Sequence, residues 1–300
     1  MSDYLAFYVI VIFQMVLLAQ FTDLLGGHRG RISVASVLFA AIGGYSYALF
    51  AATFRIGPWL AVLFAILTTS ILAFISSYLL MHLCENDFLL ATLSAQMGLI
   101  ELVNNLSCFG GPLGIRNIPT PSIGTTLIDP SLNAIWILAP AVLISSIVLP
   151  RLLDDRSSFG RVVHWIRDDE LSAAAFGLSV SRLQVALLVI VGGFSGLAGI
   201  GIVVAQGYVS PGSFDLWLSL TVLTVVYLSG TGANPLAMFG GSVTFVVLNE
   251  SLRSFGSRPE LVGPVQQITL NAILIAVLLV RRRGFAGPII AFGPSANELE

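Results

Sequence analysis

The run WLAVLFAILTTSILAFISSYLL, residues 59–80, decides the fold class of this chain. It contains no charged side chain and exceeds the roughly 18 apolar residues that can cross a hydrocarbon core about 30 Å thick. Apolar and polar residues do not alternate along it, as they would in the strands of a membrane β-barrel. Because lipid offers no water to backbone groups, such a run forms an α-helix. The sequence therefore predicts a membrane-spanning helix here.

Comparable apolar runs recur along the whole chain. Only 10% of its 300 residues are charged and 56% are hydrophobic, whereas about a quarter of the residues of a soluble domain are charged. We predict an all-α fold, a polytopic transmembrane helical bundle of about nine spans that forms a single domain, residues 1–300. The predicted spans are residues 4–25, 32–54, 58–81, 88–106, 132–150, 182–206, 214–230, 236–254 and 264–281.

Arginine placement predicts the orientation of these spans. Basic residues in short loops stay on the cytoplasmic side of a membrane. Each span carries the chain across the membrane, so successive loops lie on alternate sides. Nine spans then place the two largest groups of basic residues on the cytoplasmic side, with an external N-terminus and a cytoplasmic C-terminus. The same count makes residues 151–181 a cytoplasmic loop and residues 107–131 an external loop. The basic residues concerned are Arg151, Arg156, Arg161, Arg167, Arg182, Arg281, Arg282 and Arg283.

Composition also excludes several classes of function. All 14 basic residues are Arg, so the chain contains no P-loop, Schiff-base or kinase lysine. A net charge of -2 provides no general basic surface, so we predict that the chain does not bind nucleic acid. Acid–base side chains are scarce within the predicted spans, and the His residues lack metal-binding spacing. We therefore predict neither an enzyme nor a metal site.

The loop between the fifth and sixth predicted spans carries its own helix signals in the segment DDELSAAAFG. Asp168, Asp169 and Glu170 suit a first helical turn, where the helix dipole favours anions. Residues 171–176 are rich in helix formers, and Gly177 provides a C-terminal stop. We predict a short cytoplasmic helix of about two turns that lies in a groove on another protein. The alternative is an interfacial helix that rests on lipid headgroups.

The same loop resembles a known family. It is similar to the coupling-helix signature of branched-chain amino acid ABC permeases, in particular to the second of their two permease subunits, the LivM type. The residues that carry this resemblance are Ser158, Gly160, Arg161, Ile166, Arg167, Glu170, Ala173, Gly177 and Leu178. Other similar stretches, which extend the resemblance over residues 20–288, are LLGGHRGRISVASVLFAAIGGYSYAL (24–49), Ala91, Thr92 and Leu93, GGPLGIRNIP (110–119) and GYVSPGSFDLWLSL (207–220).

The resemblance implies a permease domain that forms one transmembrane subunit of an ATP-driven importer in the bacterial inner membrane. The implied partners are ABC ATPase subunits, a second permease subunit in a heterodimer, an extracytoplasmic solute-binding protein and membrane lipid. This chain would bind no cofactor, because ATP would be hydrolysed on the partner subunit. Branched-chain amino acids are the implied solutes, and departures at Gln96 and Thr231 keep urea, amides and aromatic acids open. The residues implied in coupling are Arg167, Asp168, Asp169, Glu170, Ala173, Ala174 and Gly177.

A polar stripe crosses the fourth predicted span. Glu101 is expected to point inward, because a charge near the bilayer centre costs about 2.5 to 3.5 kcal/mol unless it faces protein or water. The same helical face holds two Asn residues at i+3 and i+4, and Ser94 and Gly98 extend it. We interpret the stripe as a pathway wall, and the alternative is a hydrogen-bond network between helices. The candidate pathway residues are Thr92, Gln96, Glu101, Asn104 and Asn105.

Residues 107–131 form a long connection that is rich in Gly and Pro. Long loops of this kind are frequently functional, so we expect this one to fold over the outer mouth of the bundle. By family resemblance it would dock the solute-binding protein or form the outer gate, and the alternative is a plug that covers helix ends. The candidate residues are Gly110, Gly111, Gly114 and Pro119.

Two further interpretations stay open. The glycines of the sixth predicted span either let neighbouring helices approach closely, which we prefer, or mark a helix break along a pathway. An ion-coupled secondary transporter or channel is the alternative to an ABC permease, but it predicts buried ionisable pairs and often an inverted internal repeat, and apart from Glu101 the sequence shows little of either. The glycines concerned are Gly192, Gly193, Gly196, Gly199 and Gly201.

Overall fold

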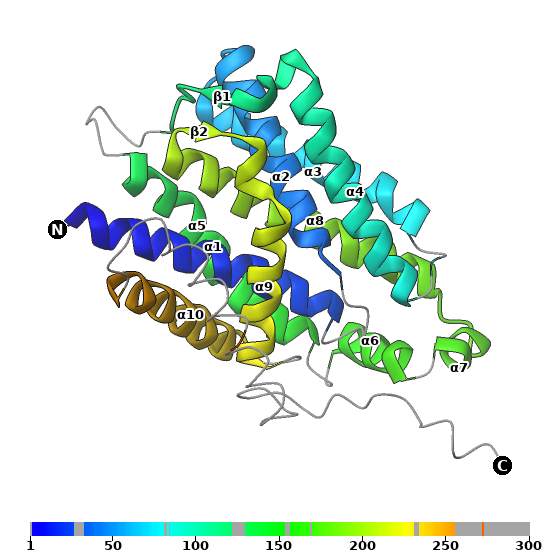
Figure 1. The fold of residues 1–300 in the computed structure, drawn as a ribbon. Helices are drawn as coiled ribbons and strands as arrows, with labels where there is room; N and C mark the ends of the chain where they lie inside the picture. Colours follow the sequence, from blue (N-terminus) through cyan, green and yellow to red (C-terminus); the bar gives the residue numbers. More distant parts are fainter. Residues whose placement is uncertain are drawn as a thin grey trace.

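The fold is that of a helical bundle (Figure 1). The computed structural model describes residues 2–26, 33–80, 83, 85–121, 130–153, 157–168, 170–230, 234–255 and 272. Helices dominate these residues, so the all-α prediction is confirmed. The small exception is a pair of two-residue strands at one end of the bundle.

The long helices follow the predicted spans closely. They are α1 (Ser2–Gly26), α2 (Ala35–Ala48), α3 (Pro58–Leu80), α4 (Glu85–Asn105), α5 (Pro130–Leu153), α8 (Val180–Gln206), α9 (Leu216–Ser229) and α10 (Pro235–Phe255). Helix α2 continues directly into a π-helical turn, η1 (Leu49–Thr53). The shorter elements are the 3-10 turns η2 (Ser107–Phe109), η3 (Gly111–Leu113) and η4 (Pro211–Phe214), the helices α6 (Ser158–Asp168) and α7 (Glu170–Ala175), and the strands β1 (Ile115–Arg116) and β2 (Tyr208–Val209).

Six described segments are long and apolar enough to cross a membrane, and each corresponds to a predicted span. They are Ala6–Gly26, Ala35–Thr53, Pro58–Leu80, Ala134–Arg151, Val180–Gln206 and Pro211–Ser229. Helices α4 and α10 contain 21 residues each but carry more polar side chains. The ninth predicted span, residues 264–281, lies almost entirely outside the described residues.

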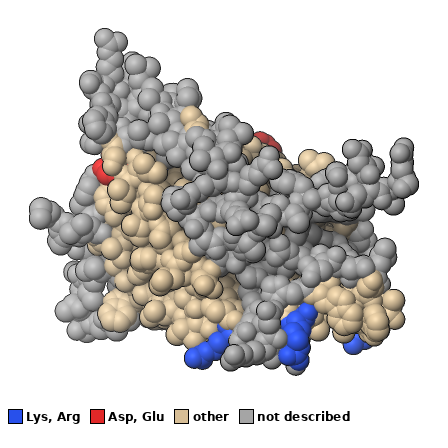
Figure 2. All heavy atoms as spheres, turned by 90° about the horizontal axis from the view of Figure 1, so that it is seen from below, with Lys and Arg blue, Asp and Glu red and all other residues tan. Residues whose placement is uncertain are grey.

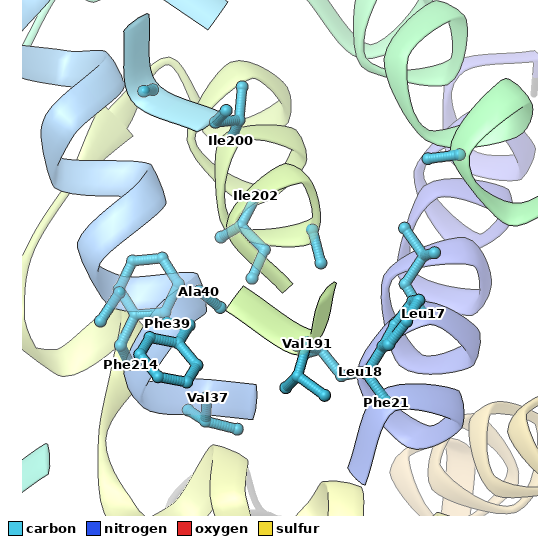
Figure 3. Packing of buried hydrophobic residues seen from close by; sticks show 14 of the residues in the cluster. Leu17, Leu18, Phe21, Val37, Phe39, Ala40, Val191, Ile200, Ile202 and Phe214 are labelled. Carbon is cyan, nitrogen blue, oxygen red and sulfur yellow. The ribbon is translucent and has the colours of Figure 1, made fainter. Parts of the chain in front are cut away.

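Helix α8 occupies the centre of the described bundle, where it packs against α1, α2, α3 and α5. Its apolar side chains meet those of two neighbours on different sides. Figure 3 shows Leu18 and Phe21 of α1 beside Val191 of α8, and Phe39 of α2 on the other side of α8. The ring of Phe21 also stacks on that of Phe194, with centroids 4.8 Å apart. The core is therefore organised around one buried span.

The glycines of α8 let α2 approach closely. A Cβ atom at Gly43 of α2 would lie 2.5 Å from the Cα of Gly196, closer than real side chains come. A Cβ atom at Gly199 would collide with the carbonyl oxygen of Ala40. Because α8 is continuous, these glycines serve close packing and do not mark a helix break. The preferred interpretation of the sixth predicted span is confirmed.

Buried hydrogen bonds connect α1 to its neighbours. Gln20 accepts a hydrogen bond from the Ser145 hydroxyl of α5 at 2.7 Å and donates one to the Ser146 hydroxyl at 3.0 Å. Thr22 shares a hydrogen bond with Ser36 of α2. Such bonds between membrane helices contribute about 0.6 kcal/mol each on average. These bonds therefore help to specify which helices adjoin α1, while the apolar core supplies most of the stability.

Helices α3 and α5 present an apolar outer surface. Large hydrophobic side chains point away from the bundle at helical spacing along both elements. A surface of this kind suits lipid and would be unfavourable in water. The exposed side chains of this surface include Leu63, Leu67, Ile71, Phe74, Ile75, Leu143, Ile144 and Ile147.

Candidate functional site

Helix α4 has one buried face and one exposed face, and the exposed face mixes polar residues with large apolar ones such as Leu90 and Met97. One face attaches to the bundle, and its residues recur at the spacing of whole helical turns. Its buried residues are Phe88, Thr92, Gln96 and Val103. The opposite face is exposed and carries small or polar residues at several positions. These exposed residues are Ser94, Gly98, Glu101 and Asn105.

The structure divides the five predicted pathway residues between these faces. Thr92 and Gln96 are buried, Glu101 and Asn105 are exposed, and Asn104 is intermediate. The Asn105 side chain donates a hydrogen bond to the backbone oxygen of Glu101 at 2.8 Å. The expectation that Glu101 points into its own bundle is wrong, because α4 attaches through its other face. Whether these residues contact solute stays a prediction.

If α4 spans the membrane as the sequence predicts, its exposed face would meet lipid only at a penalty. A carboxylate at membrane depth costs about 2.5 to 3.5 kcal/mol when nothing polar covers it. The neighbouring helix α3 avoids this cost, because its outward positions hold side chains such as Leu67 and Ile71. At membrane depth the α4 face would therefore require protein or water beside Glu101.

Gln96 fastens α4 to the start of α9. Its Nε2 donates hydrogen bonds to the backbone oxygens of Phe214 and Asp215, at 3.0 and 3.1 Å. Its Oε1 accepts a hydrogen bond from the Ser219 hydroxyl at 2.8 Å. Asp215 in turn caps α9, because its Oδ1 accepts a hydrogen bond from the backbone N–H of Leu218 at 3.1 Å. The amide of Gln96 is thus engaged within the protein.

The first half of the predicted external loop is folded onto one end of the bundle. Strand β1 of the loop pairs antiparallel with β2, which follows α8. The backbone N–H of Ile118 donates to the carbonyl oxygen of Gly207 at 3.2 Å. The Tyr47 hydroxyl of α2 donates to the carbonyl oxygen of Pro119 at 2.6 Å. The described part of the loop therefore covers this end, while residues 122–129 lie outside the described residues.

Glycines allow the tight turns of this loop. Gly110, Gly111 and Gly114 have φ angles of 81°, 57° and 68°, in the left-handed region that disfavours other residues. At Gly114 a Cβ atom would also collide with the backbone oxygen of Val209 in β2. The three predicted loop glycines thus have a structural reason to be Gly. Their contact with a gate or a binding protein stays a prediction.

Two helices, rather than one, occupy the segment between α5 and α8. Helix α6 begins after Ser157, whose hydroxyl oxygen accepts a hydrogen bond from the backbone N–H of Gly160 at 2.8 Å. It continues to Asp168, so the expectation that Asp168 belongs to the first turn of the short helix is wrong. The physical reason is that α6 is amphipathic and buries Val163 and Ile166. Sequence reasoning overlooked this helix.

The short helix α7 ends as predicted. Gly177 has a φ of 84°, and the backbone N–H of Leu178 donates to the carbonyl oxygen of Ala173 at 3.2 Å. This is the hydrogen bond of a Schellman motif, in which a left-handed glycine stops a helix. Ala173 is buried and Gly177 is exposed. The positions not described are the side chains of Arg167, Asp168, Glu170 and Ala174 and the whole of Asp169.

Aromatic and basic side chains are exposed around α6 and α7. The rings of Trp165 and Phe176 lie with centroids 5.2 Å apart and are 41% and 75% exposed. Figure 2 shows that the Arg side chains visible at this end gather along one edge, away from the described acidic side chains. The exposed arginines of α5, α6 and α8 are Arg151, Arg161 and Arg182.

The sequence profile described as "Branched-chain amino acid transport system / permease component" matches residues 4–280. The chain belongs to this permease family. The resemblance inferred from the sequence is therefore confirmed. Membership also agrees with the apolar helices of the bundle, so this chain is a multi-pass membrane protein.

Named relatives of the permease come from three bacteria. The high-affinity branched-chain amino acid transport system permease protein LivM of Salmonella typhimurium is 29% identical over 271 residues, covering 82% of this chain and 61% of the relative. LivM of Escherichia coli is 28% identical over 270 residues, with coverages of 82% and 61%. The fructose import permease protein FrcC of Rhizobium meliloti is 26% identical over 132 residues, covering 43% of this chain and 37% of the relative.

The chain spans 61% of the length of these LivM relatives. No solved structure is significantly similar to it.

Some site residues of the permease were missed from the sequence although a signal was present. Asp215 precedes an apolar run and Ser157 precedes an amphipathic one, so both are recognisable helix caps. Other features have no local signal. Gln96 and Ser219 are 123 positions apart, and only the fold brings them together.

Proposed function

We propose that this chain is the transmembrane permease subunit of an ABC importer for branched-chain amino acids or similar small organic solutes. The family match over residues 4–280 carries the proposal. The LivM relatives bear the name of a high-affinity branched-chain amino acid transport system, which favours these solutes. An ion-coupled transporter or channel has no comparable support, because the named relatives are permeases of transport or import systems.

The exposed polar face of α4 is proposed to line the pathway, opposite a second permease subunit. Glu101 and Asn105 point away from their own bundle and need protein or water beside them. A second subunit facing α4, with water between the two, would supply both. The Glu101 carboxylate would attract the ammonium group of an amino acid, and the Asn105 amide would donate to its carboxylate.

The segment of α6 and α7 is proposed to contact the ABC ATPase on the cytoplasmic side. It lies at the end of the bundle opposite to β1 and β2 (Figure 1). The exposed arginines at this end of the bundle, Arg151, Arg161 and Arg182, favour the cytoplasmic side by the positive-inside rule. The coupling residues predicted from the sequence, Arg167 to Gly177, belong to this segment. ATP would be bound and hydrolysed on the partner, and this chain would hold no cofactor itself.

The opposite end, with β1, β2 and the folded loop, is proposed to face the outside and to meet the solute-binding protein. This orientation gives an external N-terminus and a cytoplasmic C-terminus in the bacterial inner membrane. The loop is supported by main-chain pairing and by the hydrogen bond from Tyr47 to Pro119, so it offers a firm surface. The tight turns of the loop contain Gly110, Gly111 and Gly114, whose positive φ angles favour glycine.

Reconstitution tests the proposed function. The chain would be purified together with the proposed partners, an ABC ATPase, a second permease subunit and a solute-binding protein, and placed in liposomes. We expect uptake of radiolabelled leucine that requires ATP and the binding protein. Uptake driven by an ion gradient in the absence of ATP would contradict the proposal.

A deletion tests the coupling segment separately. Removal of residues 168–178 should abolish co-purification of the ATPase, because α7 and its glycine stop are lost. The control removes residues 122–128 of the external loop, which should leave ATPase binding intact. Retention of the ATPase after the first deletion would show that the coupling segment lies elsewhere.

A further inference from the structure

The side chain of Gln96 is held in a single orientation. It is fully buried, and its amide nitrogen donates to two backbone oxygens, those of Phe214 and Asp215. The Ser219 hydroxyl donates to the amide oxygen. If the amide were rotated by half a turn, its oxygen would face two carbonyl oxygens that can only accept hydrogen bonds. Neither Leu nor an ionised Glu could replace this set of bonds.

A second buried glutamine shows that this arrangement is not a general consequence of burial. Gln184 of α8 is also fully buried, but its one described hydrogen bond, to the carbonyl oxygen of Leu80, is 3.5 Å long. Within the described part of the chain its Oε1 has no partner. Gln184 is therefore a suitable control for Gln96, because it is a buried glutamine whose side chain makes only one long hydrogen bond.

The partners of Gln96 belong to the folded outer end of the molecule. Turn η4 ends at Phe214 and follows β2, which pairs with β1 of the external loop. The ring of Phe214 is buried and lies beside that of Tyr45 in α2, with centroids 6.4 Å apart. Gln96 thus connects α4 to a unit made of the loop, the strands, η4 and the first turn of α9.

Gln96 and the exposed polar residues Glu101 and Asn105 lie on the same helix, α4, so the hydrogen bonds of Gln96 also determine where those residues lie. Glu101 follows five residues later, which corresponds to about 140° around an α-helix of 3.6 residues per turn. The bonded face and the exposed face are therefore nearly opposite, as their burial shows. A rotation or slide of α4 that broke the Gln96 bonds would also move Glu101 and Asn105.

We propose that Gln96 is a positioning residue for transport, which holds the polar face of α4 at a defined rotation and depth relative to the outer end. It does not contact solute itself. This inference rests on the proposed function in one respect only, that the α4 face lines the pathway. Ser219 supports Gln96 by fixing the orientation of its amide.

Cysteine labelling measures the position of the α4 face without any assay of transport. Ser94→Cys would be introduced into the full chain after Cys84→Ser and Cys108→Ser, and its reaction rate with a hydrophilic maleimide measured in liposomes. Gln96→Leu should change this rate several-fold, because α4 loses its anchor. Gln184→Leu should leave the rate unchanged. Equal rates in both variants would overturn the proposal.

Uptake kinetics measure the consequence for transport. Gln96→Leu should raise the KM for solute about tenfold, the factor that corresponds to 1.4 kcal/mol, because α4 loses the hydrogen bonds that hold its polar face in position. Ser219→Ala should shift KM in the same direction by less. Gln184→Leu controls for a general loss of stability, so a KM shift equal to that of Gln96→Leu would overturn the proposal.

A carboxyl substitution tests the same hydrogen bonds through pH, with uptake measured per folded complex. In Gln96→Glu the ionised side chain would face two carbonyl oxygens, whereas the protonated form donates to one of them. Uptake by the Gln96→Glu variant, divided by uptake by the unmodified chain at the same pH, should therefore rise as pH falls. A constant ratio would count against the role of Gln96. Absence of ATP-dependent uptake in the unmodified complex would instead refute the proposed function, and the labelling experiment would still decide the position of α4.

Discussion

Helices α3 and α4 are neighbours in the chain, and each presents one face to the bundle and one face outward. Their outward faces differ in chemistry. Along α3 the exposed positions hold Leu67, Ile71 and Phe74, whereas along α4 they include Glu101 and Asn105. The difference shows that the outer surface of this bundle is not uniform, and that one side of it is adapted to a polar environment.

The two helices also differ in what their buried polar groups bind. On α3 the buried hydroxyls of Thr69 and Ser77 donate to carbonyl oxygens of their own helix, those of Ala65 and Phe74, both at 2.6 Å. The amide of Gln96 on α4 instead binds another segment of the protein. Helix α3 is therefore held mainly by close apolar packing, while α4 depends on directional bonds.

The largest effect is expected from a charge on the apolar face. Leu67→Glu should reduce the amount of folded chain in the membrane strongly, because a carboxylate facing lipid costs about 2.5 to 3.5 kcal/mol. Leu67 is 49% exposed, so the new side chain meets no steric obstacle inside the bundle. Size-exclusion chromatography of solubilised membranes measures the folded fraction, with Leu67→Met as the control. Normal amounts of the Glu variant would mean that this face, like that of α4, is covered by protein or water.

A smaller loss is expected from a methyl group between α8 and α3. In Gly192→Ala the new Cβ would lie 2.5 Å from the Cβ of Ala73, so the helices must separate. Overpacking of this kind costs about 1 to 3 kcal/mol. The matched control is Gly98→Ala on the exposed face of α4, where nothing lies within 4 Å of the new atom. Thermal unfolding in detergent should show a lower midpoint for the first variant only; equal midpoints would contradict the packing argument.

A loss of transport without a loss of stability is expected on α4. Glu101→Gln keeps the size of the side chain but removes its charge, and we expect uptake of leucine to fall about tenfold, or ~1.4 kcal/mol. Folded yield and co-purification of the ATPase should not change, because Glu101 points away from its own bundle. Normal uptake would favour the other interpretation of the stripe, a hydrogen-bond network without solute contact.

Much of the fold was predictable, because the length of an apolar run is a local property. The sixth predicted span, residues 182–206, differs from α8 by only two residues at its start. Helix α6 escaped prediction since it is amphipathic and lies outside the spans. The pairing of β1 with β2 could not be foreseen either. It joins Arg116 to Tyr208, and neither strand has more than two residues.

The candidate site was only partly predictable, for a related reason. Helical periodicity placed Glu101 and Asn105 on one face of α4, and the structure has both exposed on the same side. Periodicity does not say which face attaches to the bundle, so the expected inward direction of Glu101 was wrong. That direction follows from tertiary contacts of Gln96 with a segment more than 100 positions away.

The smallest effect is expected where a polar group on α3 serves only its own helix. Thr68→Val keeps the β-branched shape and removes a hydroxyl that donates to the Ala65 carbonyl oxygen at 2.9 Å. Such local bonds add little to a helix whose backbone is already paired, so the stability should change by less than about 0.5 kcal/mol. Uptake should remain normal, because α3 is not proposed to face solute. Ser219→Ala removes one hydroxyl as well, but from the anchor of α4, and it should raise the KM for solute. If both variants changed uptake equally, the distinction between a helix adapted to lipid and one adapted to a pathway would no longer hold.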